Sequence, residues 1–208
     1  MPIKITSLTS KHVEAAFTLA TEVFIENSTL HKALEIDLKT YRDYLQPCFN
    51  AMIAEGISVV AFDRETEAML GCLIATDFYQ HLEPQISPGD PFAPLAALDA
   101  ALGRQYKLMR TIAPGDVVLV DMGAVSTNAA GKGVYQLMRN ALHQLAKDRG
   151  FHSVVGELSS SSTQHVVLNK LGHQKRAEVI FANFTFEGGY PFRSIKEPQS
   201  IILAEGSV

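Results

Sequence analysis

The sequence predicts an α+β fold: a mixed, mostly antiparallel sheet with a central parallel βαβ unit, flanked by helices. Three observations predict it. Residues 117–158 read as strand, helix and strand, the pattern of a right-handed parallel crossover. Residues 57–76 read as an antiparallel hairpin, and two further strands close the chain. Amphipathic helices precede the hairpin. We expect residues 1–208 to form a single domain.

The N-terminal part is expected to contain one strand and two helical regions. Residues 2–8 are apolar enough for a first strand, and Thr9 or Ser10 can cap the helix that follows. A second helical region spans about 31–55. Pro47 predicts a kink or break within it, because proline removes a helical hydrogen bond.

The middle of the chain is expected to hold the hairpin, a loop and a short helix. Strands 57–62 and 68–76 flank a charged turn. Residues 79–93 contain three prolines and no periodicity, so they predict a loop. A helix at about 95–111 and the strand 117–125 follow.

After the Gly-Lys-Gly at 131–133 an amphipathic helix is predicted. Its apolar stripe runs from Val134 to Leu145, and Gly150 is a natural stop. The remaining elements are predicted as a strand at 152–158, a helix at 163–171, and strands at 178–186 and 199–205.

Composition and charge argue against several classes of protein. The net charge is −4 and the pI is near 6.0, which argues against a nucleic-acid partner. The first residues do not resemble a signal peptide, and no apolar run has the roughly 20 residues that span a bilayer. We expect Cys48 and Cys72 to be buried free thiols in a reducing compartment. The chain is therefore expected to be cytoplasmic, without a membrane partner, and a monomer or homodimer.

The glycines of Gly-Lys-Gly could cradle a phosphate. A P-loop is excluded because Lys132 is followed by Gly133 and position 126 is serine. A dinucleotide fingerprint is weak, since Gln136 stands where the third glycine belongs. A turn needed only for chain reversal stays open.

The stretch AVSTNAAGKGVYQLM resembles the coenzyme A loop of the GNAT acetyltransferase superfamily without a gap. Ala124 and Val125 match the strand end, and Gly133 matches the central glycine. Ala130 departs from the usual Arg or Gln, and Tyr135 from the usual small residue. An alternative register through Asn128, Gly131 and Gly133 shortens the loop by two residues, so we adopt the first.

The order of elements is also similar to GNAT domains, apart from an extra helix near 95–111. The ending NKLGH resembles the family's EKLGF, and Ser161, Gln164 and Leu168 fall at its Asn, Ala and Tyr positions. The Pro-rich loop and the C-terminal GGYPFRSIKEPQSIIL are similar to the arylalkylamine N-acetyltransferase branch.

The resemblance implies that acetyl-CoA binds with its pyrophosphate at the helix N-terminus, where free N–H groups and the dipole favour an anion. We expect the backbone amides of 131–135 and Lys132 to hold it, with the Tyr135 ring turned away from the phosphates. The expected cofactor-binding residues are Ala124, Val125, Ala130, Gly131, Lys132, Gly133, Val134, Tyr135 and Ser161.

Three side chains are candidates for proton transfer. Asp121 interrupts an apolar strand and would share a face with Gly123 and Val125; it is either a base or a locally bonded acid. Glu26 lies near the position of the branch's proposed base, but is two residues away and could be solvated. Ser162 could replace the family's general-acid tyrosine, or merely cap a helix.

The resulting hypothesis is transfer of an acetyl group from acetyl-CoA to the primary amine of a small molecule, by direct attack in a ternary complex. Tyr79 and His81 could line the amine pocket. No metal is expected, because the histidines lack ligand spacing. Two alternatives remain: a non-catalytic acyl-CoA-binding or regulatory GNAT-like domain, and acetylation of a protein or peptide amine.

Overall fold

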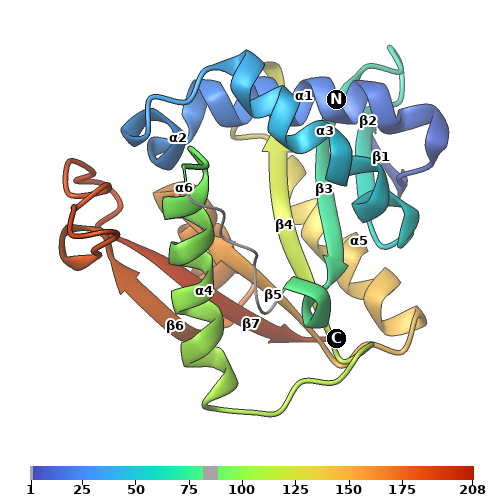
Figure 1. The fold of residues 1–208 in the computed structure, drawn as a ribbon. Helices are drawn as coiled ribbons and strands as arrows, with labels where there is room; N and C mark the ends of the chain where they lie inside the picture. The colour runs from blue at the N-terminus through green and yellow to red at the C-terminus, as the bar shows by residue number, and fades with distance from the viewer. Residues whose placement is uncertain (1, 82–88) are drawn as a thin grey trace.

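The computed structural model describes residues 2–81 and 89–208, and within them it has one seven-stranded sheet in the order β1-β2-β3-β4-β5-β7-β6 (Figure 1). Only β4 and β5 are parallel among these neighbours, so the predicted mixed sheet is confirmed. The strands are β1 (Ile3–Ser7), β2 (Val59–Asp63), β3 (Met69–Asp77), β4 (Val117–Val125), β5 (Ser153–Leu158), β6 (Gln174–Ile180) and β7 (Ser200–Ser207).

The helices follow the predicted order, with one region divided. The α-helices are α1 (Val13–Asn27), α2 (Thr29–Ala33), α3 (Leu38–Ala54), α4 (Ala93–Lys107), α5 (Val134–Asp148) and α6 (Ser161–Gln164). A π-helical turn, η4 (His165–Lys170), continues α6, and short 3-10 turns are η1 (Ser10–His12), η2 (Phe78–His81), η3 (Thr127–Ala129) and η5 (Phe181–Asn183).

The expected break at Pro47 is wrong, because α3 continues through it. The interruption lies between α2 and α3, where the Asp37 carboxylate accepts a hydrogen bond from the Thr40 N–H at 2.8 Å and starts α3. Packing of the α3 face that holds Tyr41 and Phe49 against the sheet stabilises the helix on both sides of the proline.

The helices cover the two faces of the sheet separately (Figure 1). Along β4, Val118 and Val120 pack in the α5 cluster, whereas Leu119 packs with Leu98 of α4 on the opposite face. Helices α1 and α3 cover the same face as α4, over β3 and β4. The α6–η4 segment packs on the α5 face, against the ends of β5 and β7. The molecule therefore has three layers.

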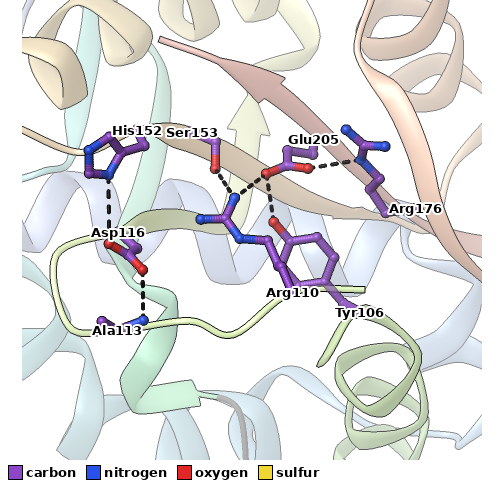
Figure 2. A network of polar contacts seen from close by, with 8 residues as sticks. All are labelled: Tyr106, Arg110, Ala113, Asp116, His152, Ser153, Arg176 and Glu205. Atoms are coloured by element: carbon purple, nitrogen blue, oxygen red, sulfur yellow. Dashed lines mark hydrogen bonds and ion pairs between the residues drawn. The ribbon is translucent and has the colours of Figure 1, made fainter. Parts of the chain in front are cut away.

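A polar network joins α4 to the C-terminal strands (Figure 2). The buried Glu205 carboxylate of β7 accepts hydrogen bonds from Tyr106 at 2.7 Å, Arg110 at 2.9 Å and Arg176 at 2.8 Å. Arg110 also approaches Ser153 at the start of β5, at 3.5 Å. This network lies beside the part of the sheet where β4 and β5 are paired, and it stabilises that end of the sheet.

Three smaller predictions are corrected. Strand β6 ends at Ile180 rather than 186, because the chain turns into η5 there. Cys72 is buried as expected, but Cys48 is exposed, since it lies on the outer side of α3. The predicted loop at 79–93 begins with η2, and residues 82–88 lie outside the described part. No helix in the described ranges has both the length and the apolar character that crossing a bilayer requires.

Candidate active site

Strands β4 and β5 separate in the middle of the sheet. They are paired from Val117 with Ser153 to Val120 with Gly156, yet β4 runs on to Val125 and β5 to Leu158. Figure 1 shows β5 leaving β4 at an angle. Beyond Val120, the two strands therefore form the sides of an opening through the sheet.

A cavity of about 790 Å³ occupies this opening, a volume typical of small-molecule sites. On the α5 face it is lined by the loop before α5, including Gly131 and Gly133. On the other face it is lined by side chains of α1 to α4, including Phe24 and Tyr41. The cavity therefore joins the predicted cofactor loop to a chamber on the opposite face of the sheet.

The cofactor loop has the backbone that its sequence predicts. Gly131 and Gly133 have φ values of 73° and 76°, in the left-handed region that glycine adopts without strain. Helix α5 begins directly afterwards at Val134, and its first N–H groups have no intrahelical acceptor. The Lys132 N–H, however, already donates to the Ala129 carbonyl at 3.2 Å. We therefore expect the Lys132 N–H to contribute less to anion binding than the neighbouring N–H groups.

Most of the expected cofactor-binding residues line the cavity; these are Val125, Ala130, Gly131, Gly133, Val134 and Tyr135. Three do not. Lys132 is exposed beside the loop, and Ala124 is buried in the cluster on the opposite face of β4. The Ser161 hydroxyl donates to the Glu197 carboxylate and lies outside the lining.

Tyr135 packs inward against β4. A Cβ atom on Gly123 would lie 2.7 Å from the Tyr135 ring, so the glycine is what leaves room for it. The ring also packs against the cluster that contains Val167 of η4. The bulky residue in the first turn of α5 is thus accommodated by a glycine on the facing strand.

The chamber on the other face has aromatic walls. The Tyr44 and Phe92 rings are stacked with centroids 3.8 Å apart, and His31 packs edge-on to Tyr41 at 4.6 Å. Burial lowers the pKa of His31 to about 4, so its ring is neutral at neutral pH. Apolar and aromatic walls suit the hydrocarbon body of a small ligand.

Three carboxyl groups line the same chamber: Asp99 of α4, Asp121 of β4 and Glu157 of β5. Burial raises the pKa of Asp99 to about 7, and the charge of Asp121 adds to the effect. Burial, then Asp99 and Asp121, raise the pKa of Glu157 well above its usual range. An acid with the pKa of Asp99 can take up or release a proton near neutral pH, and the charge of Asp121 attracts a cation.

Asp121 stands at a bulge. The register between β3 and β4 pairs Ile74 with Met122 and Ala75 with Val120, passing over Asp121. The bulge breaks the alternation of side chains, so the expected shared face of Asp121 and Gly123 is wrong. Asp121 is exposed and lines the cavity.

The other two catalytic candidates lie apart. Ser162 lines the cavity, and its hydroxyl is 3.1 Å from that of Ser160, which caps α6. Glu26 is exposed on α1 and is not among the lining residues. Tyr79 is also exposed and outside the lining; the side chain of His81 lies outside the described residues.

Sequence reasoning missed Asp99, Glu157 and Arg139. Asp99 and Glu157 are single acids in a helix and a strand, and only the tertiary fold brings them to Asp121. Arg139 is fully buried and lines the cavity, although it is not part of the predicted apolar stripe of α5. Within residues 2–81 and 89–208 no cluster of three or more His, Cys, Asp or Glu side chains could hold a metal ion.

Known structures resemble the chain, although no protein-family model and no curated sequence match it. It is similar to the C-terminal condensation domain of Ebony in complex with beta-alanyl-dopamine, at 15% identity and a TM-score of 0.88, over 100% of this chain and 99% of that chain. It is similar to mosquito arylalkylamine N-acetyltransferase like 5b, at 17% identity and a TM-score of 0.84, over 100% of both chains.

A polyamine N-acetyltransferase of Drosophila melanogaster, which catalyses the formation of N-acetylagmatine, is 14% identical with a TM-score of 0.78, over 100% of both chains. These likenesses confirm the predicted GNAT fold and its similarity to the arylalkylamine N-acetyltransferase branch.

Proposed function

We propose that the chain transfers an acetyl group from acetyl-CoA to the primary amine of a small molecule, with both substrates bound together. The observation that carries the proposal is the cavity through the sheet, which joins the glycine loop to the carboxylate and aromatic chamber. One end suits an anion at a helix N-terminus and the other suits an organic cation. The similar structures named as amine acetyltransferases support this proposal.

The residues at the loop end fit coenzyme A. The open N–H groups at the start of α5 and the two left-handed glycines would bind the pyrophosphate. The arm that carries the thioester would then pass between β4 and β5 toward the chamber. This path places the acetyl carbonyl near the carboxyl groups of the acceptor side, within reach of a bound amine.

The proposed reaction is a single displacement at the thioester carbonyl. The neutral amine nitrogen attacks the carbonyl carbon, the C–N bond forms, and the C–S bond breaks to release the thiolate, while the nitrogen loses a second proton to leave the neutral amide. Before attack the ammonium group must lose a proton, and we assign this role to the carboxyl cluster, with Asp121 the member most open to the cavity. To Ser162, which lines the cavity, we assign the transfer of that second proton to the thiolate.

The chamber also indicates the class of amine. Its rings, including Phe24, Tyr44 and Phe92, offer flat apolar contact, while Asp121 supplies negative charge beside the acids Asp99 and Glu157. An aryl or alkyl amine matches both features, since its body is apolar and its head is cationic.

The test is a thermal shift with acetyl-CoA, followed by thiol release over a panel of small amines. Acetyl-CoA at 100 times its Kd should stabilise the chain by about 2.7 kcal/mol. An amine with an aryl or alkyl body should then release free coenzyme A, and Asp121→Asn should lower kcat/KM and change the pH–rate profile. Asp43→Asn, in an exposed pair with Lys39, is the matched control.

The absence of any shift at saturating acetyl-CoA would reject the proposal. A shift without thiol release from any amine would favour the second candidate, a non-catalytic acyl-CoA-binding domain. Two observations favour that candidate: Leu168 occupies the position of the family's tyrosine, and the Tyr135 ring lies within the cavity wall. Release with peptide amines alone would indicate a protein or peptide acceptor.

A further inference from the structure

Arg139 is a buried cation without a partner among the described residues. Its side chain belongs to α5 and is fully buried, and its Nε, Nη1 and Nη2 atoms have no hydrogen-bond acceptor. It lines the cavity. Burying a guanidinium whose donors are all unsatisfied costs several kcal/mol, so Arg139 lowers the stability of the fold.

The surroundings of Arg139 make room for the group without neutralising it. A Cβ atom on Gly156 would lie 2.9 Å from Nη1, so the glycine leaves the space that the guanidinium fills. Gly156 is the last β5 residue paired with β4, so Arg139 lies where the strands separate. The nearby rings of His143 and His173 are neutral, since burial and then Arg139 lower their pKa values to about 4 and about 3.

The acids across the sheet do not serve as its counter-ion. Glu157 follows Gly156 and faces the opposite side, as strand alternation requires. Its pKa is raised by burial and by Asp99 and Asp121, whereas a neighbouring guanidinium would lower it. The donors of Arg139 are therefore available to a ligand that enters the cavity.

We propose that Arg139 binds the acetyl donor, by donating hydrogen bonds to the amide carbonyl oxygens of its pantetheine arm. This inference rests on the proposed function and adds a binding residue to the donor site. Tyr135 and Arg139 are one helical turn apart on α5 and occupy the spaces beside Gly123 and Gly156, one glycine on each diverging strand. Both side chains thus border the passage that the arm would follow.

The position of Arg139 favours the arm over the other parts of the donor. It lies five residues beyond Val134, or about 7.5 Å further along the helix than the start where the pyrophosphate is expected. The acyl end would lie in the chamber beside the charge of Asp121 and the acids Asp99 and Glu157, an environment that disfavours an anionic acyl group. The neutral amide carbonyl oxygens of the pantetheine arm, which lie between the pyrophosphate and the acyl group, are the acceptors that remain for Arg139.

The test uses the full chain and three thioesters of decreasing size: acetyl-CoA, S-acetylpantetheine, which lacks the phosphates, and S-acetylmercaptoethanol, which lacks the amides. Arg139→Met should raise KM about ten- to a hundredfold for the first two, as expected for charge-assisted hydrogen bonds, and should leave the third unchanged. The KM for the amine should change less than about twofold. Lys132→Met is the contrast, because its effect should appear with acetyl-CoA and vanish with S-acetylpantetheine.

Stability gives a second readout. Without donor, Arg139→Met should melt at the same temperature as the unmodified chain or higher, because it removes an unpaired buried charge. Arg139→Lys keeps the charge without the planar fork, so an intermediate KM is expected. Should Arg139→Met fail to fold, the same donor series with Arg139→Lys decides the question.

Four results would overturn the inference. In Arg139→Met these are an unchanged donor KM, an effect confined to acetyl-CoA, and an equal effect on S-acetylmercaptoethanol. The fourth is a preference of the unmodified chain for succinyl-CoA, which has an anionic acyl group, that Arg139→Met abolishes. Turnover of acetyl-CoA by the unmodified chain in the same assay shows that the proposed function itself holds. A failure of this inference is therefore distinguishable from a failure of the proposed function.

Discussion

At the scale of single residues, the carboxyl cluster couples activity to stability. Glu157 has a raised pKa, so the folded chain binds its proton more tightly than the unfolded chain does. Its contribution to stability is therefore lost as the pH rises from about 4.5, the usual value, toward the higher folded value. A residue that is retained despite this cost is a candidate for a functional role.

We predict that Glu157→Gln raises the melting temperature at pH 8, by about 2–4 °C for each kcal/mol added to the unfolding free energy. The increase should disappear as the pH approaches 4.5. The same variant should lower kcat/KM with a small amine. Asp99→Asn should move the acid limb of the pH–rate profile to lower pH, since Asp99 raises the pKa of Glu157. Melting curves from pH 4 to 9 and initial rates measure both effects; a lower melting temperature at pH 8 would contradict the assignment.

At the scale of elements, the two ends of α5 offer a matched pair of glycines. Gly133 precedes the helix with φ 76° and Gly150 follows it with φ 85°, and a Cβ on either one meets nothing within 4 Å. Alanine at either position should cost about 1 kcal/mol of unfolding free energy, because only the backbone is strained. Only Gly133 lines the cavity.

We therefore predict that Gly133→Ala and Gly150→Ala lose similar stability in urea unfolding, whereas only Gly133→Ala raises the KM for acetyl-CoA. The reason is that a Cβ and a shifted backbone at the start of α5 move the N–H groups expected to bind the pyrophosphate. An equal change of KM in both variants would mean that the effect comes from stability alone.

The elements also show where sequence reasoning succeeds and where it stops. Strand β4 was predicted with its observed ends, because the apolar run is bounded by a Pro-Gly-Asp turn and by Ser126. The bulge at Asp121 depends on the pairing with β3 and leaves no local signal. The burial of Arg139 was not predicted, since apolar periodicity gives no sign that a cation on the same helix is buried.

At the scale of the whole molecule, the order of elements predicts the fold, but the chamber depends on contacts between distant segments. Asp99, Asp121 and Glu157 come from α4, β4 and β5, and the aromatic wall comes from α1, α3 and the start of α4. The sequence alone favoured an acceptor site made partly by the loop at 79–94. Phe92, from the end of that loop, and Leu95 of α4 both line the cavity, whereas residues 82–88 lie outside the described part.

The polar network around Glu205 gives a prediction for the stability of the whole molecule. Burial alone would raise the pKa of Glu205, but the hydrogen bonds from Tyr106 and Arg176 that Figure 2 shows, together with Ser153, outweigh it, so the pKa is lowered. A lowered pKa in the folded state stabilises the chain above the usual value near 4.5, and this contribution is lost as the pH falls through the folded value.

Glu205→Gln should therefore lower the unfolding free energy at pH 7 by about 1–3 kcal/mol, because Arg110 and Arg176, whose side chains are 33% and 32% exposed, lose their charged hydrogen-bond partner. The difference from the unmodified chain should shrink as the pH falls below about 4.5 and through the lowered pKa of Glu205. None of the network residues lines the cavity, so the KM for acetyl-CoA should stay unchanged well below the melting temperature. Asp43→Asn, which breaks an exposed pair, should cost at most about 0.5 kcal/mol; a similar cost for Glu205→Gln would show that the network does not stabilise the fold.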